Sequence, residues 1–211
     1  MNKISLKQMT AIASFGAIGG LLYAFLKFSV PFLPAFLEIN FSDVPSLISG
    51  FAYGPFVGAM VQVVKVLVKL LLTGSSTAYV GELSDLVLGI TIVLPAAFIY
   101  KYHRTIKGAI GGLIASFFTH IVLAIFINHF ILIPFYIKFF FDGNEQVLLA
   151  VCQAAVPSID SVGWPLILMG VLPFNVLKNI IVMIIVFLVY KPLFKVINAT
   201  ARKMQKNKNR S

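Results

Sequence analysis

The chain has 211 residues, of which 59% are hydrophobic and only 11% are charged. Soluble domains are about 45–50% apolar and about 25% charged, so this composition predicts an integral membrane protein. The single cysteine, Cys152, excludes a disulfide framework and any CxxC metal or redox site. The net charge of +10 does not indicate a nucleic-acid partner, because the basic residues gather on a few short segments.

Apolar segments along the chain predict an all-α fold, a bundle of six transmembrane helices in one domain covering residues 1–211. A helix needs roughly 20 apolar residues to cross a lipid bilayer. We expect the first helix from Met9 to Val30, where prolines follow, and a bend at Pro134 within the fifth. The other expected helices cover residues 44–53, 55–72, 82–100 and 108–139, with a last span from about Pro173 to Lys191.

The distribution of charge predicts the topology. Both chain ends are basic, including a tail at about residues 196–211, and so is the loop at residues 101–107. Basic loops stay on the cytoplasmic side, and an even number of spans places both termini there. All seven acidic residues fall in or beside the opposite, external loops. The N-terminal end of the last helix is therefore expected at the outer surface.

Polar side chains inside the expected spans are the candidates for function, since a charge at a helix centre costs about 2.5–3.5 kcal/mol. Lys65 and Lys69 can pair with Glu82 or Asp85, which would be a structural link. The histidines at 120 and 129 are expected to be interhelical hydrogen-bonding groups, because no second His or Cys sits at metal-ligand spacing.

Asn175 and Lys178 are three residues apart and share one face at the start of the last helix. Two interpretations stay open from composition alone. In the first, Asn175 caps the helix after Pro173, and Lys178 extends to the membrane surface. In the second, both side chains contact a ligand.

The sequence lacks the common motifs for nucleotide binding and for hydrolytic catalysis. It contains no GxxxxGK[ST], HExxH or GxSxG motif, so we expect neither an enzyme nor a chain that binds ATP by itself. No cofactor and no metal site are expected.

Several motifs resemble the substrate-binding (S) subunits of energy-coupling factor (ECF) vitamin transporters, and most closely the riboflavin-specific RibU group. They are FSDVP at residues 41–45, a GlyPro turn, GSSTAYVGEL at 74–83, NHFILIPFY from Asn128, and PFNxxK at 173–178. The last two are the most specific to the riboflavin group. The resemblance covers most of the chain.

This resemblance implies a membrane protein that captures riboflavin near the outer surface of the cell membrane. Energy would come from an ECF module, formed by a transmembrane coupling subunit, EcfT, and two ABC-type ATPase subunits. By motif, Asn128, Asn175 and Lys178 would hold the flavin ring, with further contacts around residues 37–45. On the first helix, Ala13 and Ala17 match the pattern by which related S subunits dock on EcfT, although small residues also pack within one bundle.

The chemistry of riboflavin is compatible with these residues. Its imide edge alternates carbonyl acceptors with an N–H donor, which an asparagine amide can match, and a lysine supplies further donors. Ser42, Asp43 and Glu82 are candidates for the ribityl hydroxyls. No external arginine cluster marks a phosphate site, which favours riboflavin over flavin mononucleotide (FMN). An S subunit for another vitamin or flavin, or a self-sufficient secondary carrier, are the alternatives.

Overall fold

A computed structural model of the chain describes residues 4–208, and the side chains of residues 4–190. The side chains of the expected basic tail at 196–211 lie outside the described residues. Helices dominate the structure, and their bounds in chain order are α1 Leu6–Phe25, α2 Asp43–Tyr53, α3 Pro55–Thr73, α4 Val80–Tyr102, α5 Ile106–Ile127, α6 Ile133–Phe140, α7 Glu145–Gln153, α8 Trp164–Leu166 and α9 Leu172–Lys208.

Five helical stretches of the described residues are long and apolar enough to cross a membrane. They are α1, α3, α4, the continuous run from α5 to α6, and the run from α8 into α9. A helix, α2, occupies the position of the expected second span, but its 11 residues make a helix of only about 16 Å at 1.5 Å per residue, and it is not one of the five stretches long enough to cross a membrane. Gly54, whose φ of 101° suits glycine, makes the turn from α2 into α3.

A two-stranded antiparallel sheet follows α1, which the all-α expectation did not include. Strand β1, Lys27–Ser29, pairs with β2, Glu38–Asn40, and α1 ends at Phe25 and not near Val30. The prolines at 31 and 34 would stop a helix only near Val30, so they do not account for the end of α1 at Phe25. Pairing the two short strands satisfies backbone groups that would otherwise lack partners.

The fifth and last helical runs each contain one π-helical turn, at η1 (Asn128–Leu132) and η2 (Ile167–Val171). Each turn ends two residues before a proline, Pro134 or Pro173. A proline inside a helix removes one N–H donor and crowds the preceding turn, and a wider π turn relieves both effects. The last helical run consequently passes through Pro173 and begins at Trp164, earlier than expected.

Helix α1 packs on α3 through glycines. A Cβ atom on Gly16 would lie 2.4 Å from Val64 Cγ1, and one on Gly20 would lie 2.5 Å from Val68. Ala13 and Ala17 instead lie on the exposed side of α1. The two overlapping small-residue patterns thus occupy different faces, and the glycine face makes the contact within the bundle.

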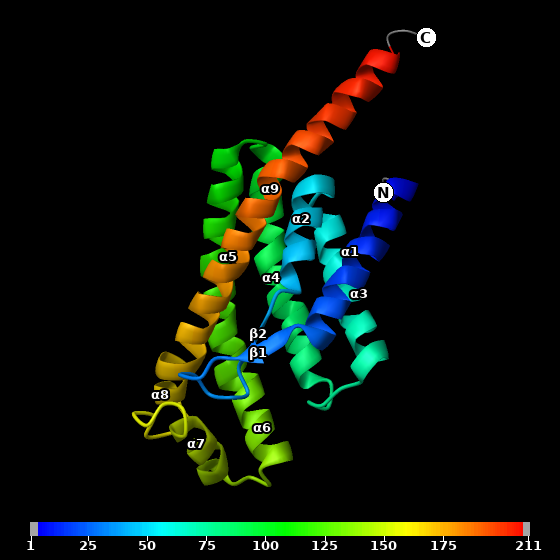
Figure 1. The fold of residues 1–211 in the computed structure, drawn as a ribbon. Coiled ribbons are helices and arrows are strands. Elements are labelled where there is room, and N and C mark those ends of the chain that lie inside the picture. Colours follow the sequence, from blue (N-terminus) through cyan, green and yellow to red (C-terminus); the bar gives the residue numbers. More distant parts are fainter. Residues whose placement is uncertain (1–3, 209–211) are drawn as a thin grey trace.

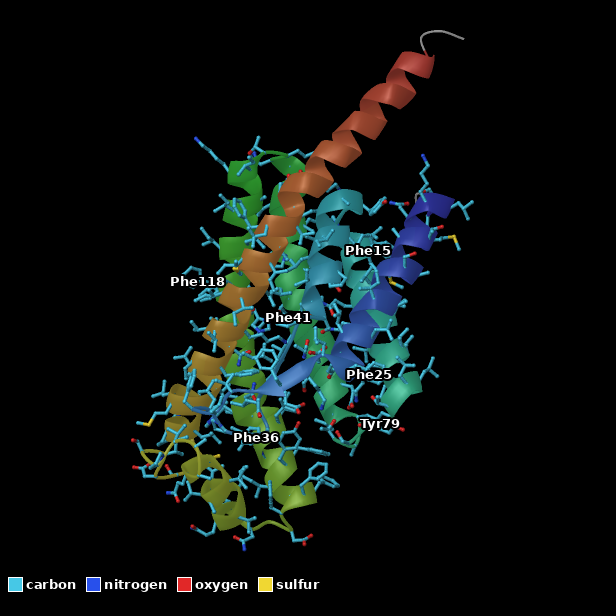
Figure 2. The ribbon with its side chains drawn as sticks, in the orientation of Figure 1. Phe15, Phe25, Phe36, Phe41, Tyr79 and Phe118 are labelled. Carbon is cyan, nitrogen blue, oxygen red and sulfur yellow. The ribbon has the colours of Figure 1, made fainter. Side chains whose placement is uncertain are left out.

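The helices form an elongated bundle in which the beginning of α1 and the end of α9 lie toward the same end (Figure 1). Helix α2 fills only the half of the bundle nearer that end, and β1 and β2 cross the bundle below it. Large apolar side chains such as Phe118 point away from the bundle, as lipid-facing residues do (Figure 2).

Candidate functional site

A cavity of about 200 Å³ lies in the half of the bundle that α2 leaves unfilled. Its walls come from the end of α1, the two strands, the α3–α4 loop, the start of α4, the α5–η1–α6 run and the start of α9. Phe36, Phe174 and Tyr136 supply aromatic surface. Its polar side chains include Asn40, Glu82, His120, Asn128, Asn175 and Lys178.

Four of the six expected ligand-binding residues line this cavity, and two do not. The four are Asn128, Asn175, Lys178 and Glu82. Ser42 and Asp43 are almost completely buried behind the wall, at 0% and 1% exposure. The expectation grouped them with the ligand contacts because sequence alone does not reveal on which side of the wall a helix start lies.

Asn175 does not cap a helix, because the helix continues through it. Its Nδ2 donates to the carbonyl oxygen of Val171, one turn earlier, at 2.8 Å. Its Oδ1 lies 3.2 Å from His120 Nε2. The amide is held from two helices and still borders the cavity.

Asn128 is held in a similar way on the neighbouring run. It is the first residue of the π turn η1, and its Nδ2 donates to the carbonyl oxygen of Ala124 at 2.8 Å. The remaining N–H and the Oδ1 atom can serve a ligand. The two asparagines reach the cavity from the two helical runs that carry π turns.

Lys178 does not extend to the membrane surface. Its Nζ lies 3.2 Å from Asp43 Oδ2 and 3.9 Å from Asp85 Oδ1. Lys65 joins the same two carboxylates, at 2.9 Å from Asp43 and 2.6 Å from Asp85. Two lysines and two aspartates therefore form one buried cluster without net charge, to which Gln62 donates a further hydrogen bond at 3.0 Å.

Glu82 and Lys69 form a second buried pair beside the first. The other carboxylate oxygen accepts the hydroxyls of Ser75 at 2.8 Å and Thr77 at 2.7 Å. Lys69 also donates to the carbonyl oxygen of Gly74 at 2.8 Å. The expected pairing of Lys65 and Lys69 with Asp85 and Glu82 is confirmed, and Glu82 holds the α3–α4 loop in place at the edge of the cavity.

Asn40 and His120 are two further polar residues of the cavity: Asn40 falls within the expected contact region at residues 37–45, and His120 was not an expected ligand contact. Asn40, on β2, accepts the Ser42 hydroxyl at 2.6 Å through its Oδ1, so Ser42 orients a cavity residue. His120, on α5, was expected only as an interhelical hydrogen-bonding group, and it does bridge α4 and α9. The second histidine within the expected spans, His129, stacks on Trp164 with ring centroids 4.6 Å apart. Within the described residues, no three His, Cys, Asp or Glu side chains are grouped to hold a metal ion.

The family model for the ECF transporter substrate-specific component matches residues 7–190. The chain belongs to this family. Its members are transport components, so the chain is a membrane transport protein and not an enzyme.

The relatives of this S component match about nine tenths of its length. The riboflavin transporter RibU of Staphylococcus aureus (strain TCH60) is 33% identical over 187 residues, which cover 89% of this chain and 90% of that protein. The riboflavin transporter FmnP of Bacillus subtilis (strain 168) is 27% identical over 188 residues, covering 89% and 92%. A solved structure of the S component of a bacterial ECF transporter superposes with a TM-score of 0.67 at 31% identity, covering 90% of this chain and 96% of the other.

Proposed function

We propose that this chain captures riboflavin as the substrate-binding subunit of an ECF transporter. The observation that carries the proposal is the position of Asn128, Asn175 and Lys178 together on the wall of one cavity with aromatic sides. The similarity to riboflavin transporters from two bacteria supports the choice of ligand.

The cavity offers complementary groups for each part of riboflavin. The amide of Asn175 retains one N–H and one oxygen lone pair, which match the adjacent carbonyl and N–H of the flavin imide. Lys178 and Asn128 add donors along the same edge, and Phe36, Tyr136 and Phe174 pack against the flat rings. Asn40 and Thr77 are placed to bond the ribityl hydroxyls.

Riboflavin fits the charges of the cavity better than FMN does. A phosphate group brings about two negative charges and favours binding sites with uncommitted cations. Each lysine on the cavity wall is already paired with a carboxylate: Lys27 with Glu38 at 2.6 Å, Lys69 with Glu82, and Lys178 with Asp43. A bound phosphate would have to compete with these carboxylates.

The wider arrangement belongs to the same proposal. The chain crosses the cell membrane six times, with β2 and the short helix α2 together making the second crossing inside the bundle, and it has both termini in the cytoplasm and the cavity toward the outside. It docks through the exposed Ala13 and Ala17 on EcfT, which couples it to two ABC-type ATPase subunits. The exposure of these alanines, next to a glycine face used inside the bundle, supports this docking face.

The visible spectrum of the purified protein tests the proposal. Protein from cells grown with riboflavin should be yellow, and ligand-free protein should bind riboflavin in isothermal titration calorimetry and bind FMN more weakly. Colourless protein with no heat of riboflavin binding would exclude the proposal. If FMN binds more tightly than riboflavin, the proposed ligand is wrong, but the proposed class of transporter still stands.

A further inference from the structure

His120 is a buried histidine that contacts two other helices at the cavity wall. It is 1% exposed, and its Nε2 lies 3.2 Å from Asn175 Oδ1 on α9. Its Nδ1 lies 3.2 Å from the carbonyl oxygen of Leu88 on α4. That carbonyl already accepts the Thr91 hydroxyl at 2.7 Å, so it does not depend on the histidine for a donor.

The hydrogen bonds of Asn175 determine which way its amide points. The carbonyl oxygen of Val171, 2.8 Å away, can only accept, so the amide atom beside it must be the nitrogen. The atom that faces His120 is then the amide oxygen, which also only accepts. His120 Nε2 therefore donates to Asn175, because the 2.8 Å contact at Val171 is too short for two facing acceptors, whereas the contact between His120 Nδ1 and the Leu88 carbonyl is longer, at 3.2 Å.

The two contacts fix the pattern that Asn175 presents to the cavity. One N–H and one oxygen lone pair remain, in a defined order along the wall. Rotating the amide by half a turn would reverse that order, but it would also oppose two oxygens at Val171 and two N–H groups at His120. Asn128 has a comparable bond to Ala124, but among the described residues no second helix holds its amide.

We infer that His120 is a positioning residue, which donates to Asn175 and so makes the site selective for ligands with a carbonyl beside an N–H. The inference rests on the proposed function, because it explains how the same site distinguishes a flavin imide from other edges. His120 acts through Asn175, and its effect on binding should depend on that side chain.

A double-mutant cycle tests this dependence. Riboflavin binding is measured by calorimetry for the wild type, His120→Phe, Asn175→Ala and the double variant. In the wild-type background we expect His120→Phe to weaken binding by roughly tenfold, the size of one net hydrogen bond. In the Asn175→Ala background the same change should cost less than twofold. Equal losses in both backgrounds would overturn the inference.

Two further variants separate positioning from damage to the fold. His120→Gln keeps a donor that can reach Asn175 and should recover most of the affinity, whereas a loss equal to that of His120→Phe would contradict the inference. Ser116→Ala is the control on the same helix face, one turn earlier, because its hydroxyl bonds only the Leu113 carbonyl, at 2.9 Å. It should bind riboflavin like the wild type.

A modified ligand gives an independent readout of the imide contact. Riboflavin methylated on the imide nitrogen cannot donate, so wild-type protein should bind it more weakly than riboflavin. His120→Phe should discriminate less between the two ligands; unchanged discrimination would contradict the inference. If the wild-type chain binds no riboflavin at all, both the proposed function and this inference are wrong. If it binds riboflavin but the affinity losses of His120→Phe and Asn175→Ala are additive, only this inference is wrong.

Discussion

Ion pairs hold the charged side chains around the cavity in place. Lys65 and Lys178 balance Asp43 and Asp85 in a buried cluster, so removing one charge leaves another without its partner. Such an unbalanced charge is costly because the interior cannot solvate it. We therefore expect Asp43 to affect binding indirectly, by keeping Lys178 at the cavity wall.

Asp43→Asn tests this contribution. We expect it to lower the free energy of unfolding by about 3–5 kcal/mol, the cost of breaking a buried pair. The control is Glu38→Gln, which breaks the pair with Lys27, whose side chains are 41% and 42% exposed. That change should cost no more than about 1 kcal/mol. Thermal and denaturant unfolding in detergent measures the stability of both variants. Equal losses of unfolding free energy would show that the buried cluster stabilises the protein no more than the exposed pair does.

Lysine and asparagine at the site were detectable from sequence, while their partners were not. Asn175 and Lys178 stand out because polar side chains are expensive in an apolar helix. The pairing of Lys178 with Asp43 joins residues far apart in the chain, and no local pattern encodes it. The role of His120 depends on the Val171 carbonyl, which only the structure brings next to Asn175.

Close contacts between helices depend on glycines whose surroundings differ even between neighbours. On α5, a Cβ atom at Gly112 would lie 2.6 Å from the carbonyl oxygen of Ala96 on α4, whereas one at Gly111 would have nothing within 4 Å. Backbone atoms cannot move aside as the end of a flexible side chain can. The two adjacent glycines therefore have different roles in the same helix.

Gly112→Ala and Gly111→Ala form a matched pair. The first should lower stability by about 1–3 kcal/mol through overpacking. The second should leave stability unchanged or raise it by up to about 1 kcal/mol, since alanine favours helix. Thermal unfolding in detergent measures the difference; similar midpoints for both variants would contradict the close approach of α4 and α5.

The two faces of α1 should also respond differently to a larger side chain. Gly20→Leu places bulk against Val68 and should destabilise the isolated protein. Ala17→Leu lies on the exposed side and should leave stability and riboflavin binding intact while reducing uptake by cells that contain the whole transporter. Normal uptake by Ala17→Leu would argue against this docking face.

Helix boundaries were the weakest part of the sequence prediction at the scale of elements. The run Leu26–Val30 is as apolar as the helix before it, so its short strand was hidden, and only the prolines at 31 and 34 gave a signal. The bend at Pro134 was expected, but its form as a π turn upstream of the proline was not. The hydrophobic pattern shows which residues are apolar, but it does not show how the backbone accommodates the N–H donor that a proline lacks.

The orientation of the whole molecule in the membrane that we propose from the distribution of charge can be measured with single cysteines. Arg104 lies in the basic loop between α4 and α5, and Ser158 lies in the loop between α7 and α8. These two loops are at opposite ends of the bundle (Figure 1). Each position can carry one cysteine, as Arg104→Cys or Ser158→Cys. An impermeant thiol reagent should label Ser158→Cys on intact cells, and Arg104→Cys only after permeabilisation. The reverse pattern would invert the proposed topology.

The native cysteine should not interfere with this labelling. Cys152, in α7, is completely buried, and burial raises the pKa of its thiol to about 11. A raised pKa keeps the thiol protonated at neutral pH, and only the thiolate reacts readily. Wild-type protein should therefore show little labelling on either side, which gives the experiment its baseline.

The half of the bundle that contains α2 has a core of buried apolar side chains. Phe51, Tyr100 and Tyr190 contact one another edge to face there, and the two tyrosine hydroxyls share a hydrogen bond. The cavity is therefore closed at the α2 end. Binding of the ligand in it should not open a path for ions across the membrane. A cell that makes this chain in excess of its partners should consequently keep its membrane potential, and the surplus copies would act as a store of vitamin at its surface.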